Sequence, residues 1–257
     1  MFEIHDKLYD LRKCLLSDCQ GDVVSNLTGK ERARYVQQMF GQIASHYDLL
    51  NRLMTGGQDK KWRRMVVEKL TPKPDGVYLD IGTGTGDLAY EILEQQPEAW
   101  VIAADFTLEM MLIGKARARQ DRILWVVADS ENLPFKDCAF NGVVSGYLLR
   151  NVPSPERTLQ EQARVLVSRG SVVSLDTTPP KKNLIYPLIW VYLHVVIPIL
   201  GTIIAGNADA YTYLPDTTQK FLTAERLAEQ HEKAGLQPVK FIRKMFGTMA
   251  IHWATKS

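Results

Sequence analysis

Short runs of apolar residues alternate along this chain with longer stretches in which apolar residues recur every three or four positions. The short runs are typical of buried strands, and the longer stretches are typical of helices that pack one face on a sheet. Strands and helices in alternation predict a mostly parallel α/β sheet with helices on both faces. The expected strands here are residues 77–81, 100–104, 123–127, 141–147 and 171–176.

Helical patterns connect these strands. One helix is expected to begin near Asp87, and others span about 108–119 and 155–167. The last of them is followed by a Ser-Arg-Gly stop at 168–170.

Both ends of the chain add further elements. Residues 1–30 are weakly patterned, and we expect an N-terminal extension there. Residues 31–70 predict a cap of two helices that are separated by a Thr-Gly-Gly break. Beyond Thr223, a helix and two strands at 238–245 and 249–255 complete the domain that spans 31–257.

An apolar stretch at 184–205 interrupts the alternation, within an insert that we place at 183–220. Its length approaches the ~20 apolar residues that a membrane span requires. Two prolines, Gly201 and His194 break it, and the α/β pattern resumes afterwards. We therefore favour a hydrophobic lid over the site, with an element resting on a membrane and a true span as alternatives.

Charge and cysteine content exclude several classes of function. The net charge of +2 gives no field for wrapping nucleic acid, so no nucleic-acid partner is expected. Cys14, Cys19 and Cys138 are odd in number and lack metal-ligand spacing, which favours a reducing compartment without a metal site. No signal peptide is evident, so we expect a cytoplasmic protein, with peripheral contact to the inner face of the membrane.

A glycine-rich turn follows the first expected strand, and an acid closes the second strand at Asp105. Glycines let the backbone approach a ligand closely, and an acid at that position can bind the hydroxyls of a ribose. Where a dinucleotide fingerprint has its third glycine, this chain has Asp87, which is unfavourable beside a diphosphate. A cationic ligand without phosphate, S-adenosylmethionine, fits Asp87 and Asp80 better. Structural glycines in an ordinary turn remain the alternative.

Other residues are expected to complete the cofactor site. Asp129 follows the third strand and can accept a hydrogen bond from an adenine amine, although it can also cap a helix. Tyr47, Asn51 and Thr55 share one helix face and can line a pocket. We also count Met110 as a contact, although its spacing fits core packing. The predicted cofactor contacts are Thr55, Asp80, Gly82, Thr83, Gly84, Gly86, Asp105, Phe106, Met110, Asp129 and Ser130.

Three further stretches resemble the signatures of the quinone-biosynthesis C-methyltransferases, which act on demethylmenaquinone and ubiquinone precursors. They begin at Tyr47, Leu149 and Asn207, and the resemblance covers about residues 31–257. The chain departs from the family's usual residues at several positions: Asp59, Gly146, Tyr147, Leu148, Asp176, Thr177, Thr178 and Pro179.

The resemblance implies a class I, Rossmann-like methyltransferase fold with a seven-stranded sheet. It also implies transfer of a methyl group from S-adenosylmethionine to a ring carbon of a lipophilic quinol, most simply demethylmenaquinol. Arg150 would stabilise a phenolate, Asn151 would hold the geometry, and Asp209 or Tyr211 would take up the proton. Tyr47, Asn51, Tyr147, His194 and Asn207 would contact the acceptor, and a homodimer is one expected arrangement.

Two other functions stay open at this point. The departures at Tyr147 and Thr177 fit a methyltransferase for another lipophilic phenol. A non-catalytic module that binds S-adenosylmethionine is the second alternative.

Overall fold

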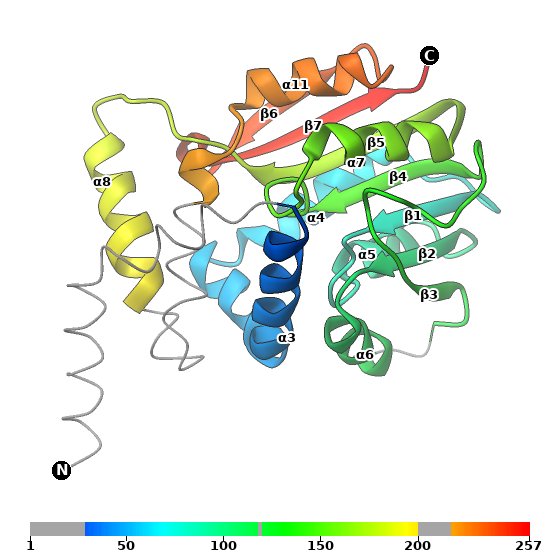
Figure 1. The fold of residues 1–257 in the computed structure, drawn as a ribbon, viewed down its shortest axis with the longest axis horizontal. Helices are drawn as coiled ribbons and strands as arrows, with labels where there is room; N and C mark the ends of the chain where they lie inside the picture. The colour runs from blue at the N-terminus through cyan, green and yellow to red at the C-terminus, as the bar shows by residue number, and fades with distance from the viewer. Residues whose placement is uncertain (1–28, 118–119, 200–216) are drawn as a thin grey trace.

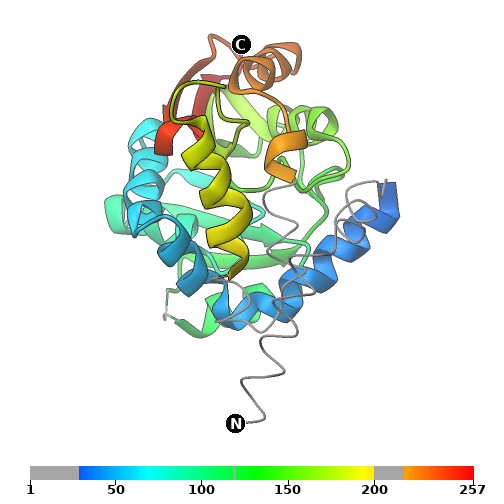
Figure 2. The ribbon, with the colours of Figure 1, turned by 90° about the vertical axis from the view of Figure 1, so that its left-hand side faces the viewer.

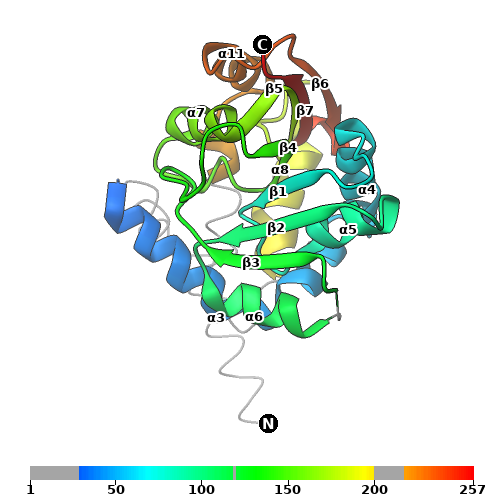
Figure 3. The same cartoon turned by 90° about the vertical axis from the view of Figure 1, so that its right-hand side faces the viewer.

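A seven-stranded sheet forms the centre of the molecule in the computed structural model, which describes residues 29–117, 120–199 and 217–257. The strand order is β3-β2-β1-β4-β5-β7-β6 (Figures 1 and 3). The first five strands in this order run parallel, and β7 is antiparallel to both of its neighbours. The strands are β1 (Val77–Ile81), β2 (Trp100–Asp105), β3 (Ile123–Val127), β4 (Phe140–Gly146), β5 (Leu166–Thr177), β6 (Lys240–Lys244) and β7 (Met249–Thr255).

The strand order reverses between β1 and β4, which are adjacent in the sheet although β2 and β3 separate them in the chain. In open α/β sheets, ligands bind at such a switch point, beyond the carboxyl ends of the strands. The sheet thus directs attention to the loops after β1, β2 and β4.

Helices cover both faces of the sheet. They are α3 (Gly29–Met54), α4 (Gln58–Leu70), α5 (Asp87–Gln95), α6 (Leu108–Arg117), α7 (Pro155–Val165), α8 (Tyr186–Val191) and α11 (Ala224–Lys233), with a π-helical turn (Tyr192–Val196) after α8 and a 3₁₀ turn (Met245–Gly247) before β7. In Figure 3, α4 and α5 lie on one side of the strands and α7 lies on the other.

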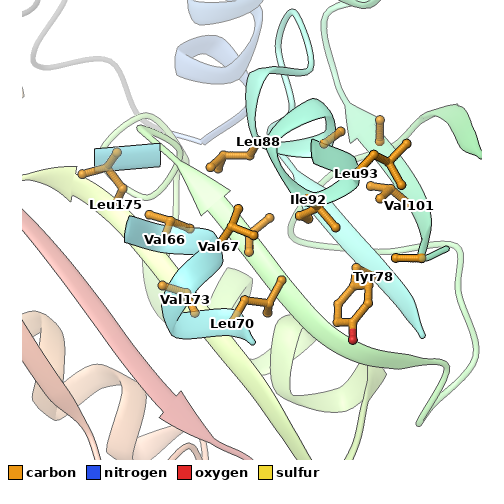
Figure 4. Packing of buried hydrophobic residues seen from close by; sticks show 14 of the residues in the cluster. Val66, Val67, Leu70, Tyr78, Leu88, Ile92, Leu93, Val101, Val173 and Leu175 are labelled. Atoms are coloured by element: carbon orange, nitrogen blue, oxygen red, sulfur yellow. The ribbon is translucent and has the colours of Figure 1, made fainter. Parts of the chain in front are cut away.

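Side chains along each strand point alternately to the two faces of the sheet, so a separate apolar core forms on each face. Tyr78, Val144 and Val173 face α4 and α5, and these residues form one buried cluster with Val66 and Ile92 (Figure 4). Their strand neighbours on the opposite face, such as Leu79, Val143 and Val172, pack in a second cluster with Val165 at the end of α7. This two-sided burial explains why the parallel strands are nearly continuous apolar runs.

A third apolar cluster lies outside the sheet. It joins the long helix α3 to α8, which stands at the margin of the molecule (Figures 1 and 2). Met39, Ile43 and Leu50 contribute from α3, and Ile189 and Leu193 contribute from α8 and the π-helical turn. Within the described ranges, no helix is both long and apolar enough to cross a bilayer.

The predicted α/β class is confirmed, and the predicted bounds of β1, β3 and β7 agree with the structure. The predicted stop at 168–170 is wrong. Helix α7 ends at Val165, and residues 168–170 belong to β5, where Arg169 has φ +61°. Backbone bonds from Arg169 N to Lys256 O and from Lys256 N to Gly170 O hold this turn against the C-terminal segment. The Ser-Arg-Gly sequence therefore marks an irregular turn within a strand and does not mark the end of a helix.

Candidate active site

The chain turns sharply after β1 at three glycines, Gly82, Gly84 and Gly86, whose φ angles are +67°, +56° and +83°. A Cβ atom at Gly82 would lie 2.8 Å from Leu148 Cδ1, so the close approach of these two loops requires glycine. The backbone N–H of Gly84 donates to Asp105 Oδ2 at 2.7 Å. The turn is thus fastened to the end of β2.

The carboxylate of Asp105 has a fixed direction. Its other oxygen, Oδ1, accepts a hydrogen bond from the backbone N–H of Thr107 at 2.7 Å. Burial raises the pKa of Asp105, and the backbone hydrogen bonds oppose that shift. Each carboxylate oxygen keeps acceptor capacity beyond these bonds, which suits the two hydroxyls of a ribose.

A cavity of about 490 Å³, which we call the main cavity, lies beside the glycine turn. Its volume is typical of a small-molecule site. The residues Tyr47, Tyr147 and Asn151 contribute to its wall. Seven of the predicted cofactor contacts also line it: Gly82, Gly84, Asp105, Phe106, Met110, Asp129 and Ser130.

The four remaining predicted contacts lie elsewhere. Asp80 and Thr83 line a small cavity of about 40 Å³ that shares Gly82 and Gly84 with the main cavity. A Cβ atom at Gly86 would lie 2.6 Å from the ring of Trp125, so this glycine serves packing. Thr55 lies in the lateral cavity described below.

Asp129 closes a turn after β3. Its Oδ1 accepts a hydrogen bond from the backbone N–H of Glu131 at 2.9 Å, and no helix begins there. The alternative that Asp129 caps a helix is therefore wrong. Its expected contact with adenine stays a prediction.

Asp80 is a buried acid with unused acceptor capacity. Its Oδ2 accepts hydrogen bonds from Thr83 Oγ1 at 2.5 Å and from the backbone N–H of Ala89 at 3.0 Å. Its Oδ1 is buried and has no hydrogen-bond partner among the described residues. Burial raises the pKa of Asp80 to about 7. A cationic group of a bound cofactor would relieve that cost.

Asp87 has a different environment from the one that we expected. Arg63 Nη1 lies 3.1 Å from its Oδ2, and Arg117 Nη1 lies 2.7 Å from its Oδ1. Two guanidinium groups therefore already compensate its charge. The carboxylate joins α5 to α4 and α6 and lines the small cavity together with Asp80, so its expected place beside a cationic ligand stays a prediction.

A second cavity, which we call the lateral cavity, has a volume of about 60 Å³ and a mostly apolar wall. Four of its polar atoms are buried without a hydrogen-bond partner in the described part of the chain, namely Asn51 Nδ2, Tyr147 Oη, Arg150 Nε and Thr177 Oγ1. Unsatisfied buried polar atoms are costly unless a ligand or water pairs with them. The cavity is lined by Asn51, Met54, Thr55, Tyr147, Arg150, Thr177, Leu193, Ile197, Thr218, Met245, Thr248 and Met249.

Arg150 is oriented by Asp176 at the end of β5. Asp176 Oδ1 lies 3.6 Å from Arg150 Nη1, and Asp176 Oδ2 accepts the backbone N–H of Arg150 at 3.2 Å. Burial raises the pKa of Asp176, and the positive charge of Arg150 opposes that shift. The carbonyl of Arg150 accepts a hydrogen bond from Arg32 Nη2 at 2.7 Å, which links this loop to α3. Arg150 is thus fixed from two sides.

Tyr147 lines both cavities, and its backbone has φ +59°, a conformation that few non-glycine residues adopt. The side-chain amide of Asn151 donates to its carbonyl at 2.8 Å. Such strain persists only where the surroundings enforce it, and it concentrates at functional sites. The strained backbone thus belongs to the residue whose side chain is shared by the walls of the two cavities.

The other predicted acceptor contacts are dispersed. Tyr47 lines the main cavity and Asn51 lines the lateral cavity. His194 lines neither of them, because its ring stacks on Trp190 and bonds to Gln219 on the outer part of the insert. The predictions for Asn207, Asp209 and Tyr211 lie outside the described residues.

Sequence reasoning missed a cluster of charges beside the turn. Asp59, 1% exposed, pairs with Arg63, and Arg63 also pairs with Asp87. Arg117 then connects Asp87 to Asp48 at 3.1 Å. The spacing of Asp59 and Arg63, four apart on a helix, was the available signal.

The sequence profile of the ubiE/COQ5 methyltransferase family matches residues 27–256. The chain is 45% identical to a ubiquinone/menaquinone biosynthesis C-methyltransferase UbiE of Desulfotalea psychrophila, over 86% of this chain and 90% of that protein. It is 41% identical to a demethylmenaquinone methyltransferase of Thermus thermophilus, over 83% of this chain and 98% of that protein.

Solved structures share the fold at low identity. A methyltransferase of Thermotoga maritima, described as a possible histamine N-methyltransferase, has a TM-score of 0.59 at 19% identity, covering 86% of this chain and all of that one. The [4+2]-cyclase SpnF has a TM-score of 0.62 at 16% identity, covering 86% and 94%. These likenesses show the fold alone. The extent of the family match, together with the identity to its relatives, shows that the chain belongs to the ubiE/COQ5 methyltransferase family and is an S-adenosylmethionine-dependent methyltransferase.

Proposed function

We propose that this enzyme methylates a ring carbon of a polyprenylated hydroquinone, converting demethylmenaquinol to menaquinol. The lateral cavity supports this proposal most strongly. Its mostly apolar wall carries four unpaired buried polar atoms, on Asn51, Tyr147, Arg150 and Thr177, and it shares Tyr147 with the main cavity. A flat ring with hydroxyl groups would satisfy those atoms. The names of the relatives point to the same class of acceptor.

The main cavity would hold S-adenosylmethionine, which supplies an electrophilic methyl group when bound. The glycine turn leaves room that a Cβ atom would fill, since one at Gly84 would lie 3.3 Å from Met110 Cε. Asp105 is placed for the ribose hydroxyls, and Asp80 offers a buried acceptor for a cationic group. These residues would bind and orient the donor beside Tyr147.

Arg150 would stabilise the ionised hydroxyl of the acceptor, which makes the neighbouring ring carbon nucleophilic. The guanidinium keeps its charge at all relevant pH values, and Asp176 fixes its direction. Burial raises the pKa of Tyr147, so its hydroxyl stays protonated and can donate a hydrogen bond to the same oxygen. The ring carbon would form a bond to the methyl group while the bond from that methyl group to sulfur breaks, which leaves S-adenosylhomocysteine, and the ring carbon would then lose its proton. Asp209 and Tyr211 remain our predicted acceptors of that proton.

The tail of the acceptor requires an apolar surface. Leu193 and Ile197 from the insert and Met54 from the end of α3 supply one in the lateral cavity. Because a polyprenylated quinol resides in a bilayer, we propose that the enzyme works as a peripheral membrane protein.

A second candidate is methylation of another lipophilic phenol. It is favoured by the residues that differ from the family's usual pattern, Tyr147 and Thr177, because both place an unpaired hydroxyl in the lateral cavity. Those hydroxyls could recognise an oxygen pattern different from that of a naphthoquinol.

Incubation with methyl-labelled S-adenosylmethionine would separate the two candidates. One reaction would contain a reduced demethylmenaquinone analogue with a short isoprenoid tail, and the other a monophenol with the same tail. We expect label in the hydroquinone product at a rate at least about tenfold above the monophenol, because the monophenol leaves one polar group of the cavity unpaired. Labelling of the monophenol alone would refute the quinol assignment.

A further inference from the structure

Helix α8 and the π-helical turn after it have two apolar faces with different surroundings. The inner face, with Ile189, Leu193 and Ile197, packs on α3 in the third apolar cluster. On the other side, Leu184, Leu188 and Val191 are 97%, 73% and 46% exposed. Leu188 and Val191 are three apart on α8, and Leu184 lies in the turn just before the helix; we call these three exposed residues the outward stripe. Soluble helices normally direct such a stripe toward a core.

The position of this stripe makes it accessible. Helix α8 stands at the margin of the molecule, and the other described elements lie on one side of it (Figures 1 and 2). Trp190, 45% exposed, flanks the stripe and stacks on His194. An exposed tryptophan beside aliphatic side chains is typical of elements that rest in the interface of a bilayer.

The charged side chains in the sequence next to the stripe are basic. Lys181 and Lys182 directly precede it, and the sequence contains no Asp or Glu from Thr177 to Ala208. Lys182 is exposed, whereas Lys181 lies 3.7 Å from Glu225 Oε1. Lysines near a membrane surface are attracted to anionic lipid.

The inner face of the same helix connects the stripe to the site, because Leu193 and Ile197 line the lateral cavity. A lipid tail that leaves a bilayer along this helix would therefore arrive next to Arg150. We propose that the outward surface of α8 and of the segment just before it, defined by Leu184, Leu188, Trp190 and Val191 with Lys181 and Lys182, docks on an anionic phospholipid bilayer. The proposal rests on the peripheral membrane location given above, and it identifies the surface and the lipid charge.

Vesicle flotation of the full chain tests the docking surface without any acceptor. The probes are vesicles of phosphatidylcholine alone and vesicles of phosphatidylcholine with phosphatidylglycerol. The test variant is Leu184→Ser with Leu188→Ser. The matched control is Leu112→Ser with Leu124→Ser, since Leu112 on α6 and Leu124 on β3 are 57% and 53% exposed.

We expect the unmodified protein and the control variant to float with the anionic vesicles. The test variant should partition at least about tenfold more weakly, because two exposed leucines no longer enter the apolar layer. The variant Lys182→Gln should weaken partition to the anionic vesicles severalfold, with little change on neutral vesicles. Activity on a short-tailed acceptor in solution should be unchanged in the test variant.

Three results would overturn the docking surface. They are no flotation of the unmodified protein, equal partition of the test and control variants, and self-association without vesicles that only the test variant loses. The last result would assign the stripe to a second copy of the chain. If methyl transfer to quinols is absent while flotation behaves as expected, the proposed function fails and the docking surface stands.

Discussion

Arg150 is a buried charge to which we assign a role in the proposed reaction. It is 5% exposed, and Asp176 balances its charge while leaving its Nε without a partner in the described residues. A buried guanidinium that is only partly paired retains a strong preference for an anionic oxygen. In the proposed reaction, this arrangement would favour the phenolate of the acceptor over its neutral hydroxyl.

The variant Arg150→Ala tests this role. We expect the turnover number to fall by about 10²-fold or more, because a preorganised donor to the developing charge is lost. The affinity for S-adenosylhomocysteine, measured by calorimetry, should stay nearly unchanged because Arg150 does not line the main cavity. Equal losses in turnover and in cofactor affinity would instead assign Arg150 a structural role.

Asp80 predicts a pH dependence of cofactor binding. Its pKa in the folded protein is about 7, so below pH 7 the carboxyl group is mostly neutral. If a cationic group of the cofactor pairs with the ionised form, affinity should rise with pH up to about 7 and level off above it.

Calorimetry with S-adenosylhomocysteine between pH 5.5 and 8 measures this profile. The variant Asp80→Asn should bind more weakly at pH 8 and show a flatter profile, since the amide does not titrate in this range. A profile that is the same in the variant and the unmodified protein would contradict the assignment.

The residues of the glycine turn could be predicted because their role is local. Gly82, Gly84 and Asp105 are close in sequence, and strand–turn–helix geometry determines where they lie. The strain at Tyr147 and the pairing of Arg150 with Asp176 could not be predicted in this way. Both depend on which loops meet at the edge of the sheet, and a single sequence does not specify that meeting.

At the scale of elements, a chain of ion pairs joins four helices around the turn. Arg63 on α4 pairs with Asp87 at the start of α5, and Arg117 on α6 pairs with both Asp87 and Asp48 on α3. Asp48 Oδ1 also accepts a hydrogen bond from Thr85 Oγ1 in the turn at 2.8 Å. The helical cap is thus tied directly to the cofactor site.

The variant Arg63→Met tests the centre of this chain. We expect the free energy of unfolding to fall by about 3–5 kcal/mol, because removing one partner leaves a buried charge without compensation. Arg63 is 7% exposed and its partner Asp59 is 1% exposed, so solvent cannot replace the lost pair.

Arg64→Met is the matched control for this variant. Its side chain is 71% exposed and lies 3.8 Å from Glu68, so its loss should change stability by less than about 0.5 kcal/mol. Urea denaturation measures both variants. Similar losses in the two would show that the buried chain of ion pairs does not stabilise the fold.

Elements with a strong local pattern were predicted well, and interrupted elements were not. The bounds of β1 and β3 follow from uninterrupted apolar runs between turn residues. The irregular start of β5 was mistaken for the end of a helix, because a Ser-Arg-Gly sequence serves either role. Its pairing with the C-terminal segment, more than 80 residues away, decided between them.

At the scale of the whole molecule, two buried histidines connect the last helix to the sheet. His231 on α11 and His252 on β7 stack with ring centroids 5.5 Å apart. Burial lowers the pKa of His231 to about 4 and the pKa of His252 to about 3. Both are therefore neutral in the folded protein near pH 6.5, whereas an unfolded chain begins to protonate them there.

This difference predicts a loss of stability in mild acid. Above pH 6.5 both states hold neutral histidines, so the contribution to stability does not depend on pH. As pH falls from 6.5 toward 4, the unfolded state binds more protons, and each histidine lowers the free energy of unfolding by about 1.4 kcal/mol per pH unit.

The variant His252→Gln isolates one of these histidines, since glutamine can still donate to the carbonyl of Ala224, which His252 Nε2 contacts at 2.8 Å. Between pH 6.5 and 4.5 its stability should decline less steeply than that of the unmodified protein, by roughly one histidine's contribution of 1.4 kcal/mol per pH unit. Equal slopes in urea unfolding experiments would contradict the buried neutral state.

The central claim of the proposed function is transfer of a methyl group to a ring carbon. The most direct test is a reaction with S-adenosylmethionine carrying a ¹³C methyl group and a reduced demethylmenaquinone analogue, followed by NMR of the extracted product. The account predicts a new labelled methyl group bonded to the quinone ring, formed by the unmodified protein and about 10²-fold more slowly by Arg150→Ala. A labelled methyl group on oxygen, or none in the extracted quinone, would contradict it.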